Sequence, residues 1–305
     1  MHWNIDPVIT TIGPLELRYY GLFFALGLLL AARAAPENFA SYGLPREHAD
    51  RLIVWIPIGM LLGAHYFHLV FYQPEGLLDL PHFDADGHFV LGSLLGLGSG
   101  LASHGGALGC IVALYVFWRR HGRPTGAPFH RYADAVMVTS VWVYPWVRLG
   151  NFFNSEIVGR PTDASFGVVF DRFDDIPRHP VQLYEALLYF AELALVLWAH
   201  RHYGRRLRDG TMFYSVLGLH FALRFVAEFF KESQGIDEGW PLHLNMGHVL
   251  SAPVTIVCAI LVFGTRRFAI FPLVTPPRNV DIPSAASRAG SGTGTRRPSA
   301  RRGRA

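Results

Sequence analysis

The chain has 305 residues, of which 51% are hydrophobic and 14% aromatic, whereas 16% are charged, against about 25% in an average soluble domain. Apolar runs long enough to cross about 30 Å of hydrocarbon recur along it, which excludes an ordinary soluble fold and predicts an all-α polytopic membrane protein. The net charge of +4 does not indicate nucleic-acid binding, because the arginines are spread over loops and a tail. Cys110 and Cys258 lie in apolar runs and indicate neither a disulfide framework nor a metal site.

The apolar runs predict about seven transmembrane helices. Residues 1–18 lack a secretory signal and predict an amphipathic lead-in, with Trp3, Tyr19 and Tyr20 suited to the membrane interface. Residues 90–106 predict a loop or re-entrant segment before a helix that starts at about residue 107 or earlier. The expected spans cover residues 19–35, 52–72, 107–118, 132–151, 181–199, 211–230 and 247–263.

The distribution of arginine predicts the orientation. Basic residues gather in alternate loops, at residues 33–51, 119–131, 201–208 and from 266 onward. By the positive-inside rule these loops are cytoplasmic, which places the N-terminus outside and the C-terminus in the cytoplasm. Residues 1–268 are therefore expected to form an integral-membrane domain. Residues 269–305, rich in Gly, Ser, Pro and Arg, are expected to form a disordered cytoplasmic tail.

One polar stretch departs from this pattern. Directly after an apolar run, residues 147–163 crowd together Arg148, Asn151, Asn154, Glu156, Arg160 and Asp163. An arginine at the centre of a membrane helix costs about 2.5–3.5 kcal/mol on insertion scales. Because several polar or charged residues in this one stretch would each carry such a cost, a binding site is favoured over the alternative, an ordinary polar loop between two spans. Gly150 and Gly159 would let backbone approach a ligand or another helix closely.

Four further polar clusters fall at helix starts or inside an apolar run. They lie at residues 103–106, 178–185 and 245–248, and at Arg224 with Glu228, whose i, i+4 spacing predicts an internal ion pair. Two guanidinium groups, Arg148 and Arg224, suit bidentate recognition of a phosphate, and a phosphate inside a bilayer belongs to a lipid head group. No Walker loop and no paired-carboxylate metal signature is present, so neither a metal nor another cofactor is expected.

These motifs resemble those of a known family. The run Arg148-Leu149-Gly150-Asn151-Phe152-Phe153-Asn154-Ser155-Glu156, with Gly159-Arg160 after it, is similar to the signature of the phosphatidylglycerol–prolipoprotein diacylglyceryl transferases. The similarity extends over residues 6–267, with the other blocks in the same order. These blocks are Arg18-Tyr19-Tyr20-Gly21, His104-Gly105-Gly106, residues 178–185, residues 224–230 and Asn245-Met246-Gly247.

The resemblance implies transfer of the sn-1,2-diacylglyceryl group from phosphatidylglycerol to the lipobox cysteine thiol of a prolipoprotein, with release of glycerol phosphate. It implies a monomer in the bacterial inner membrane, with no cofactor and no nucleic acid. It also implies that Arg148 and Arg224 hold the lipid phosphate and that His104 accepts or relays the thiol proton. The residues expected to bind substrate are Tyr20, Asn151, Asn154, Glu156, Gly159, Arg160 and Glu228.

Three positions depart from the family's pattern. His65 stands where an arginine is usual, residues 144–147 are bulky where small residues are common, and His220 replaces a tyrosine. A misplacement of Arg148 by about 1 Å can cost on the order of 10²-fold in rate. The alternative to an active transferase is therefore a catalytically impaired relative that binds lipid or lipoproteins. A transporter is disfavoured, because no repeat pairs the two halves of the chain.

Overall fold

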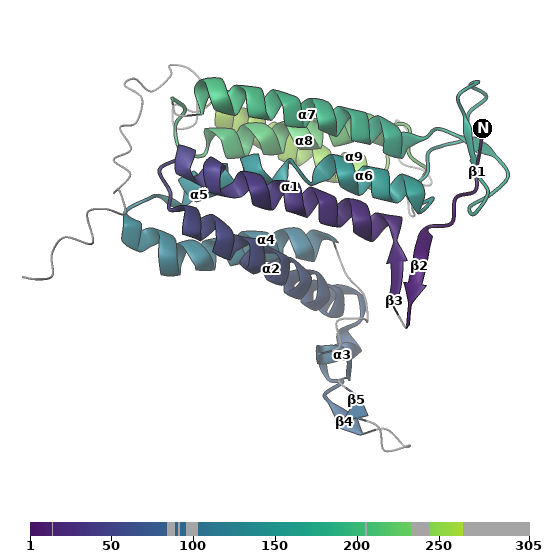
Figure 1. Cartoon of the computed structure of the whole chain (residues 1–305), viewed down its shortest axis with the longest axis horizontal. Coiled ribbons are helices and arrows are strands. Elements are labelled where there is room, and N and C mark those ends of the chain that lie inside the picture. The colour runs from purple at the N-terminus through teal and green to yellow at the C-terminus, as the bar shows by residue number, and fades with distance from the viewer. Residues whose placement is uncertain are drawn as a thin grey trace, which may run out of the picture.

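The structure is a computed structural model that describes residues 1–13, 15–83, 89–90, 92–95, 103–204, 206–232 and 244–264. The predicted disordered tail, residues 269–305, lies outside the described residues. Within them the chain is mostly helical, and the longer helices run roughly side by side (Figure 1). These helices are α1 (Tyr19–Ser41), α2 (Arg46–Tyr72), α4 (Ser103–Phe117), α5 (Phe129–Ser140), α6 (Tyr144–Phe153), α7 (Val181–Tyr203), α8 (Thr211–Glu228) and α9 (Met246–Ala259).

Within the described part of the chain, four helices are long and apolar enough to cross a membrane. They cover Tyr19–Ser41, Arg46–Phe71, Val181–Tyr203 and Gly247–Gly264, and they coincide with four of the seven predicted spans. Large apolar side chains on their outer faces, such as Leu29, Val54, Leu187 and Ile256, are exposed. Such exposure suits a protein whose surroundings are hydrocarbon rather than water.

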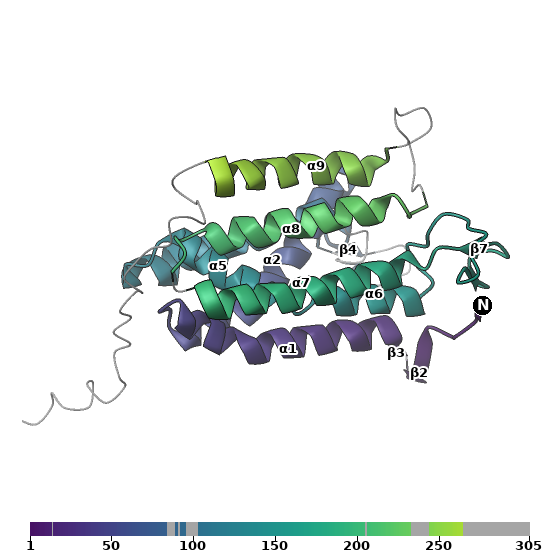
Figure 2. The ribbon, with the colours of Figure 1, turned by 90° about the horizontal axis from the view of Figure 1, so that it is seen from above.

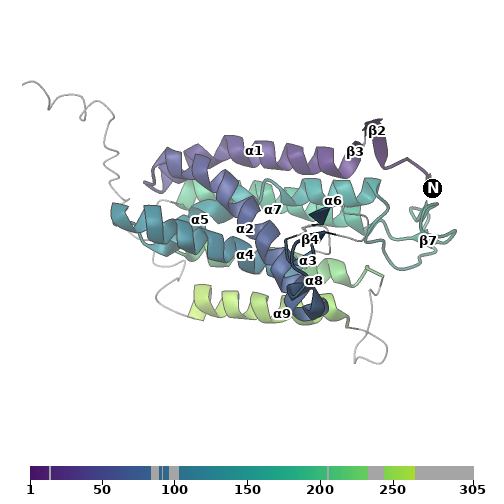
Figure 3. The same ribbon diagram turned by 90° about the horizontal axis from the view of Figure 1, so that it is seen from below.

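The helices form a layered bundle. Helix α8 lies between α9 on one side and α7 on the other, and α6 lies between α7 and α1 (Figure 2). Helices α2 and α4 pack on each other at the flank of this bundle (Figure 3). Helix α4 begins before residue 107, as the sequence allowed, and continues into the π-helical turn Trp118–Gly122. This arrangement brings α6, α7 and α8 together in the interior.

The predicted span 132–151 is two helices rather than one. Helix α5 ends at Ser140 and α6 begins at Tyr144, with a three-residue turn between them. Pro145 explains the break, because it has no N–H with which to bond the carbonyl of Val141 one turn earlier. The break makes α6 a separate short helix, and this helix carries Arg148.

The N-terminal segment forms strands rather than the predicted amphipathic lead-in. Strand β1 (His2–Trp3) pairs in parallel with β6 (Val168–Phe170), which pairs antiparallel with β7 (Pro177–Arg178). Strands β2 (Val8–Ile12) and β3 (Leu15–Arg18) form a hairpin that leads into α1. The Trp3 ring packs 4.3 Å from that of Phe152 and 5.3 Å from that of Phe153, so Trp3 is partly buried against the end of α6.

Short elements extend the same end of the bundle. A 3₁₀ turn at Pro74–Leu77 follows α2, and β4 (His82–Phe83) pairs with β5 (Phe89–Val90) before α3 (Gly92–Leu95). At the opposite end, a 3₁₀ turn at Arg123–Thr125 links α4 to α5, and α9 continues into a π-helical turn at Ile260–Gly264. Strands β1, β2 and β3 lie at one end of the bundle, together with the N-terminus, whereas β4 and β5 lie beyond α3, below α2 (Figure 1).

Glycines bring α2 and α4 into backbone contact. A Cβ added at Gly63 would collide with the backbone of Gly105 and Gly109, and one at Gly59 would collide with Gly109 and Ala113. This is the close approach that small residues four positions apart permit between membrane helices. An apolar groove of about 690 Å³ runs between the two helices as far as Gly105. The residue before Gly105 is His104, so the helix pair fixes where the backbone of His104 lies.

Candidate active site

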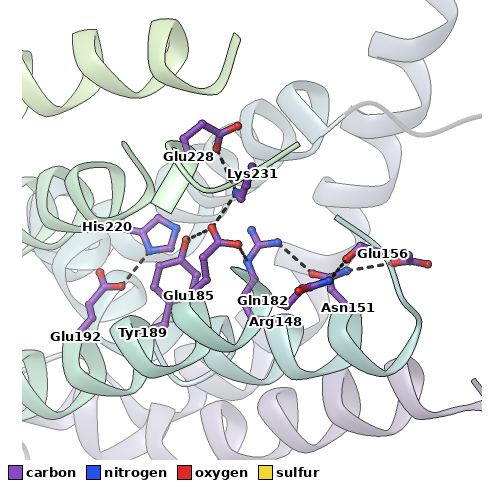
Figure 4. Close-up of polar contacts among 10 residues, drawn as sticks. All are labelled: Arg148, Asn151, Glu156, Gln182, Glu185, Tyr189, Glu192, His220, Glu228 and Lys231. Atoms are coloured by element: carbon purple, nitrogen blue, oxygen red, sulfur yellow. Dashed lines mark hydrogen bonds and ion pairs between the residues drawn. The ribbon is translucent and has the colours of Figure 1, made fainter. Parts of the chain in front are cut away.

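Helix α6 and the turn after it form the first half of the candidate site. Arg148 Nη1 donates to Asn151 Oδ1 at 3.0 Å, three residues along the same helix face. Asn151 Nδ2 donates to Glu156 Oε2 at 3.1 Å (Figure 4). Asn154 Nδ2 donates to Glu156 Oε1, also at 3.1 Å. Four of the predicted residues are therefore joined in one chain of side-chain contacts.

The turn that holds Glu156 is strained. Ser155 and Ile157 on either side of it both have a φ of +55°, a conformation that a β-branched isoleucine rarely adopts. Such residues cost about 1–3 kcal/mol each and persist where the surroundings over-determine them. Gln182 contributes to that constraint, since its Nε2 donates to the Glu156 carbonyl oxygen at 2.7 Å. The carboxylate itself is held by the side-chain amides of Asn151 and Asn154.

Helix α7 contributes a buried carboxylate opposite Arg148. Glu185 Oε2 lies 3.2 Å from Arg148 Nε, close enough for an ion pair but without the alignment of a hydrogen bond. The side chain of Glu185 is 0% exposed and that of Arg148 is 13% exposed. Tyr189, one turn along α7, donates from its hydroxyl to Glu185 Oε1 at 3.1 Å. Its ring centroid lies 5.9 Å from the Arg148 guanidinium carbon, within range of a cation–π contact.

Lys231 closes the cluster from the end of α8. Its Nζ donates to Glu185 Oε1 at 2.9 Å and to Glu228 Oε2 at 3.1 Å, and the residue is 4% exposed. The predicted pair between Arg224 and Glu228 is therefore wrong: Glu228 pairs with Lys231. The pair between Glu228 and Lys231 could have been predicted from the sequence. Lys231 is the one lysine of the chain, and it follows Glu228 at the i, i+3 spacing of neighbours on a helix.

Arg224 is the second predicted arginine of the site, and it lies on α8. Among the described residues it makes no hydrogen bond and no ion pair. It lies within electrostatic range of Glu185 and Tyr189, which also interact with Arg148. The two predicted arginines therefore act on the same carboxylate from α6 and α8. A guanidinium in an apolar helix is costly without a partner.

Gly159 and Arg160 form a strap beside the cluster. Gly159 N donates to the His179 carbonyl oxygen at 3.2 Å and Arg160 N to that of Phe230 at 2.8 Å. Arg160 Nε donates to the carbonyl oxygen of Lys231 at 2.9 Å. A Cβ on Gly159 would collide with the backbone of His179 and Phe230. The two residues thus hold the backbone that carries Lys231.

Arg178 anchors the same strap from β7. It is buried, donates to Asp174 through Nε and Nη2, and donates through Nη1 to Glu232 at 2.5 Å and to the Gly159 carbonyl oxygen at 3.0 Å. The hydrogen bonds from Arg178 hold the pKa of the Asp174 carboxyl below its usual range. Arg178 therefore serves the geometry of the strap rather than the interior cluster.

Two predicted residues approach from other helices. Tyr20, at the start of α1, packs against Gly150, where an added Cβ would collide with its ring, and it lies in electrostatic range of Arg148 and Glu156. His104 is the second residue of α4, and its side chain lies outside the described part of the structure. Bulky residues at 144–147 fill the centre of the bundle: Trp146 packs on Phe23 and Phe190.

Comparisons with known proteins agree on one family. The family model for prolipoprotein diacylglyceryl transferase matches residues 7–264. Relatives named phosphatidylglycerol–prolipoprotein diacylglyceryl transferase include those of Tolumonas auensis, 38% identical over 88% of this chain and 98% of the relative, and of Chloroherpeton thalassium, 34% identical over 88% and 95%. That of Bacteroides fragilis is 33% identical over 84% and 92%. The chain belongs to the prolipoprotein diacylglyceryl transferase family.

Proposed function

We propose that this chain transfers the sn-1,2-diacylglyceryl group of phosphatidylglycerol to the lipobox cysteine thiol of a prolipoprotein. The sulfur forms a bond to the glycerol carbon that carries the phosphate ester, and the bond between that carbon and the ester oxygen breaks. Glycerol phosphate leaves, and the thiol proton finally resides on it or on solvent. Family membership and the cluster around Glu185 together support this reaction.

One observation carries the assignment of the phosphate site. Arg148 and Arg224 act on one buried carboxylate, and Arg224 makes no hydrogen bond or ion pair with the described residues. A phosphodiester bound beside Arg224 would receive the charge-assisted hydrogen bonds that this guanidinium does not make within the protein. As the leaving oxygen gains charge, the same groups would stabilise the transition state more than the ground state.

The remaining predicted residues receive proposed roles on the same basis. His104 would accept the thiol proton, because a thiolate rather than a thiol is the competent nucleophile. Asn151, Asn154 and Glu156 would orient Arg148 and contact the glycerol head group from the strained turn. Tyr20 would close the site from α1. Gly159, Arg160 and Glu228 would act through Lys231, whose backbone and ammonium they hold.

The membrane setting is part of the proposal. We place the chain in the bacterial inner membrane as a monomer with seven spans, with the N-terminus outside and the tail, residues 269–305, in the cytoplasm. Strands β1 to β3 and the end of α6 lie at the end of the bundle that bears the N-terminus (Figure 1). This position would let a prolipoprotein reach the site from the outer side of the membrane.

The test is direct. Purified protein is mixed with phosphatidylglycerol and a lipobox peptide, and the thioether product is measured by mass spectrometry together with released glycerol phosphate. We expect turnover that depends on the peptide cysteine, and a cysteine-to-serine peptide is the matched control. A chain cut after Thr275 should retain most of this turnover. Lipid binding without release of glycerol phosphate would contradict the proposal.

A further inference from the structure

Three ring side chains meet one helical turn away from the ionic cluster of the site. Tyr144 belongs to α6, Tyr189 to α7 and His220 to α8. The ring centroid of His220 lies 4.4 Å from that of Tyr144 and 4.7 Å from that of Tyr189, and the two tyrosine centroids are 6.3 Å apart. Aromatic rings at such separations interact, so each ring packs on the other two across three helices. Together they form an aromatic layer, which none of the roles proposed above uses.

The aromatic layer follows the ionic cluster at helical spacing. Each of its members is four residues from a charged residue of the site: Tyr144 from Arg148, Tyr189 from Glu185, and His220 from Arg224. Residues four apart are neighbours on one face of a helix. Helices α6 and α8 end, and α7 begins, at the end of the bundle that bears the N-terminus (Figure 2), so in every pair the ring lies further from that end. Figure 4 shows Tyr189 and His220 on the side of Arg148 that faces away from Asn151.

Hydrogen bonds add to ring packing in holding the layer. The Tyr144 hydroxyl and Ser140 Oγ, one turn earlier, are 2.8 Å apart. His220 Nδ1 and Glu192 Oε2 of α7 are 3.0 Å apart, and the Glu192 side chain is 0% exposed. Tyr189 is 2% exposed. Because protein interiors are as densely packed as organic crystals, rings with packed neighbours and polar partners have little room to reorient.

The layer is joined to both arginines of the site. The Tyr189 hydroxyl donates to Glu185, the carboxylate that faces Arg148, and Tyr189 lies within electrostatic range of Arg224. Helices α6 and α8 both pack on α7, and the layer adds a direct ring contact between them. The position of Arg148 relative to Arg224 therefore depends on how the three rings fit together.

We propose that the aromatic layer positions Arg148 and Arg224 for one phosphate group by fixing the separation of α6 and α8. The inference deepens the proposed function and rests on it for the identity of the ligand, a phospholipid head group. Two guanidinium groups can share one phosphodiester only when their spacing matches its oxygens. The rings touch no reacting atom, so they are positioning residues that act through the helices. Loss of a ring weakens lipid binding and slows transfer in a chain that is still folded.

The experiment measures two quantities on the purified full chain in detergent: the Kd of a fluorescent phosphatidylglycerol, and kcat for thioether formation with a lipobox peptide. Tyr144→Leu removes one ring but keeps an apolar residue that suits a helix. Its kcat should fall about tenfold or more and its Kd should rise, because a shift of about 1 Å in a catalytic group can cost on the order of 10²-fold. Tyr144→Phe keeps the ring and loses only the hydroxyl, so both quantities should stay close to those of the unmodified chain.

A second variant removes a ring from another helix. His220→Leu combined with Glu192→Leu takes out both polar partners, so that neither is left buried without the other. This variant should repeat the fall in kcat and the rise in Kd, and it decides the question if Tyr144→Leu does not fold.

A buried ring at the other end of α1 from Tyr20 provides the matched control. Phe39 is 1% exposed and packs on Tyr132 of α5, with centroids 6.0 Å apart. Phe39→Leu should lower Tm but leave Kd and kcat unchanged at a temperature below the melts of all variants. If the ring variants also lower Tm alone, the layer only packs the bundle and the inference is overturned. If the unmodified chain forms no thioether, but Kd rises in the ring variants and not in Phe39→Leu, the proposed reaction fails while the role of the layer stands.

Discussion

Lys231 Nζ lies 2.9 Å from Glu185 Oε1, and this contact joins the end of α8 to the first turns of α7 across 46 residues of sequence. Glu185 thereby has a cation on each side, Arg148 on one and Lys231 on the other. Such a carboxylate is tolerable in the interior because both partners are present. Lys231 Nζ also donates to Glu228 Oε2, so Glu228 pairs with Lys231 instead of Arg224.

Removal of the Lys231 ammonium should destabilise the protein and lower activity. Lys231→Met leaves Glu185 and Glu228 buried with less compensation, and loss of one partner from a buried pair costs about 3–5 kcal/mol. The expected result is a lower Tm in detergent together with at least a tenfold loss of transfer. Lys231→Arg keeps the positive charge and should restore most of both. Equal behaviour of the Met and Arg variants would show that charge at this position is unimportant.

The two arginines should respond differently to truncation. Arg148→Ala strips Glu185 and Asn151 of a partner, so it should abolish turnover and lower Tm. Arg224→Ala removes no hydrogen bond or ion pair with the described residues, so Tm should change little. The same variant should lose on the order of 10²–10³-fold in kcat/KM, as for a donor that stabilises developing charge.

The readout for this contrast is a thermal melt paired with kinetics on one preparation of each variant. Arg224→Lys is the matched substitution, because a point charge cannot reproduce a bidentate contact with phosphate. Its kcat/KM should fall between those of the unmodified chain and Arg224→Ala. Full turnover of Arg224→Ala would show that Arg224 does not belong to the phosphate site.

His104→Gln should strongly reduce turnover with little effect on lipid binding.

Contact between α2 and α4 should depend on Gly63. An alanine Cβ there would collide with the backbone of Gly105, so Gly63→Ala should push the helices apart and lower both Tm and the yield of folded protein. Gly21→Ala on α1 is the matched control, because a Cβ at Gly21 meets nothing within 4 Å. A melt that is unchanged in Gly63→Ala would mean that the helix pair adjusts without cost.

Local contacts of the site were accessible from the sequence, whereas contacts between distant elements were not. The link from Arg148 to Asn151 follows from i, i+3 spacing on a helix, and Gly159 was expected where backbone approaches closely. Lys231 was missed because its partner Glu185 depends on how the end of α8 packs against α7.

The same limit applies to the fold. Runs of apolar residues predicted four helices that the structure has and that are long enough to cross a membrane. The parallel pairing of His2 with Val169 leaves no periodic signal in a two-residue strand. The break before α6 was marked only by Pro145, which a hydropathy pattern does not weigh. The strand pairing and the break before α6 were therefore not predicted from the sequence, although both help to position Arg148.

Acid should loosen the strap around Gly159 before it unfolds the helices. Hydrogen bonds from Arg178 hold the pKa of the Asp174 carboxyl below its usual range. A carboxyl with a depressed folded-state pKa contributes stability that is fully present above the ordinary aspartate value of about 4, and that is lost as the pH falls through the lower folded value. Asp174 also holds the Arg178 guanidinium that binds the Gly159 carbonyl oxygen, so its protonation should free the strap.

The measurement is limited proteolysis of the purified chain with an acid-active protease between about pH 5 and about pH 2, with cut sites read by mass spectrometry. Cleavage within residues 159–178 should rise as the pH falls, while the helices remain protected. Asp174→Asn removes the titrating group, so that variant should be cut at every pH and show no step. Asp175→Asn alters the neighbouring carboxyl and is the matched control, which should retain the step. A step that persists in Asp174→Asn would place the acid-sensitive group elsewhere and leave the strap dependent on its backbone hydrogen bonds alone.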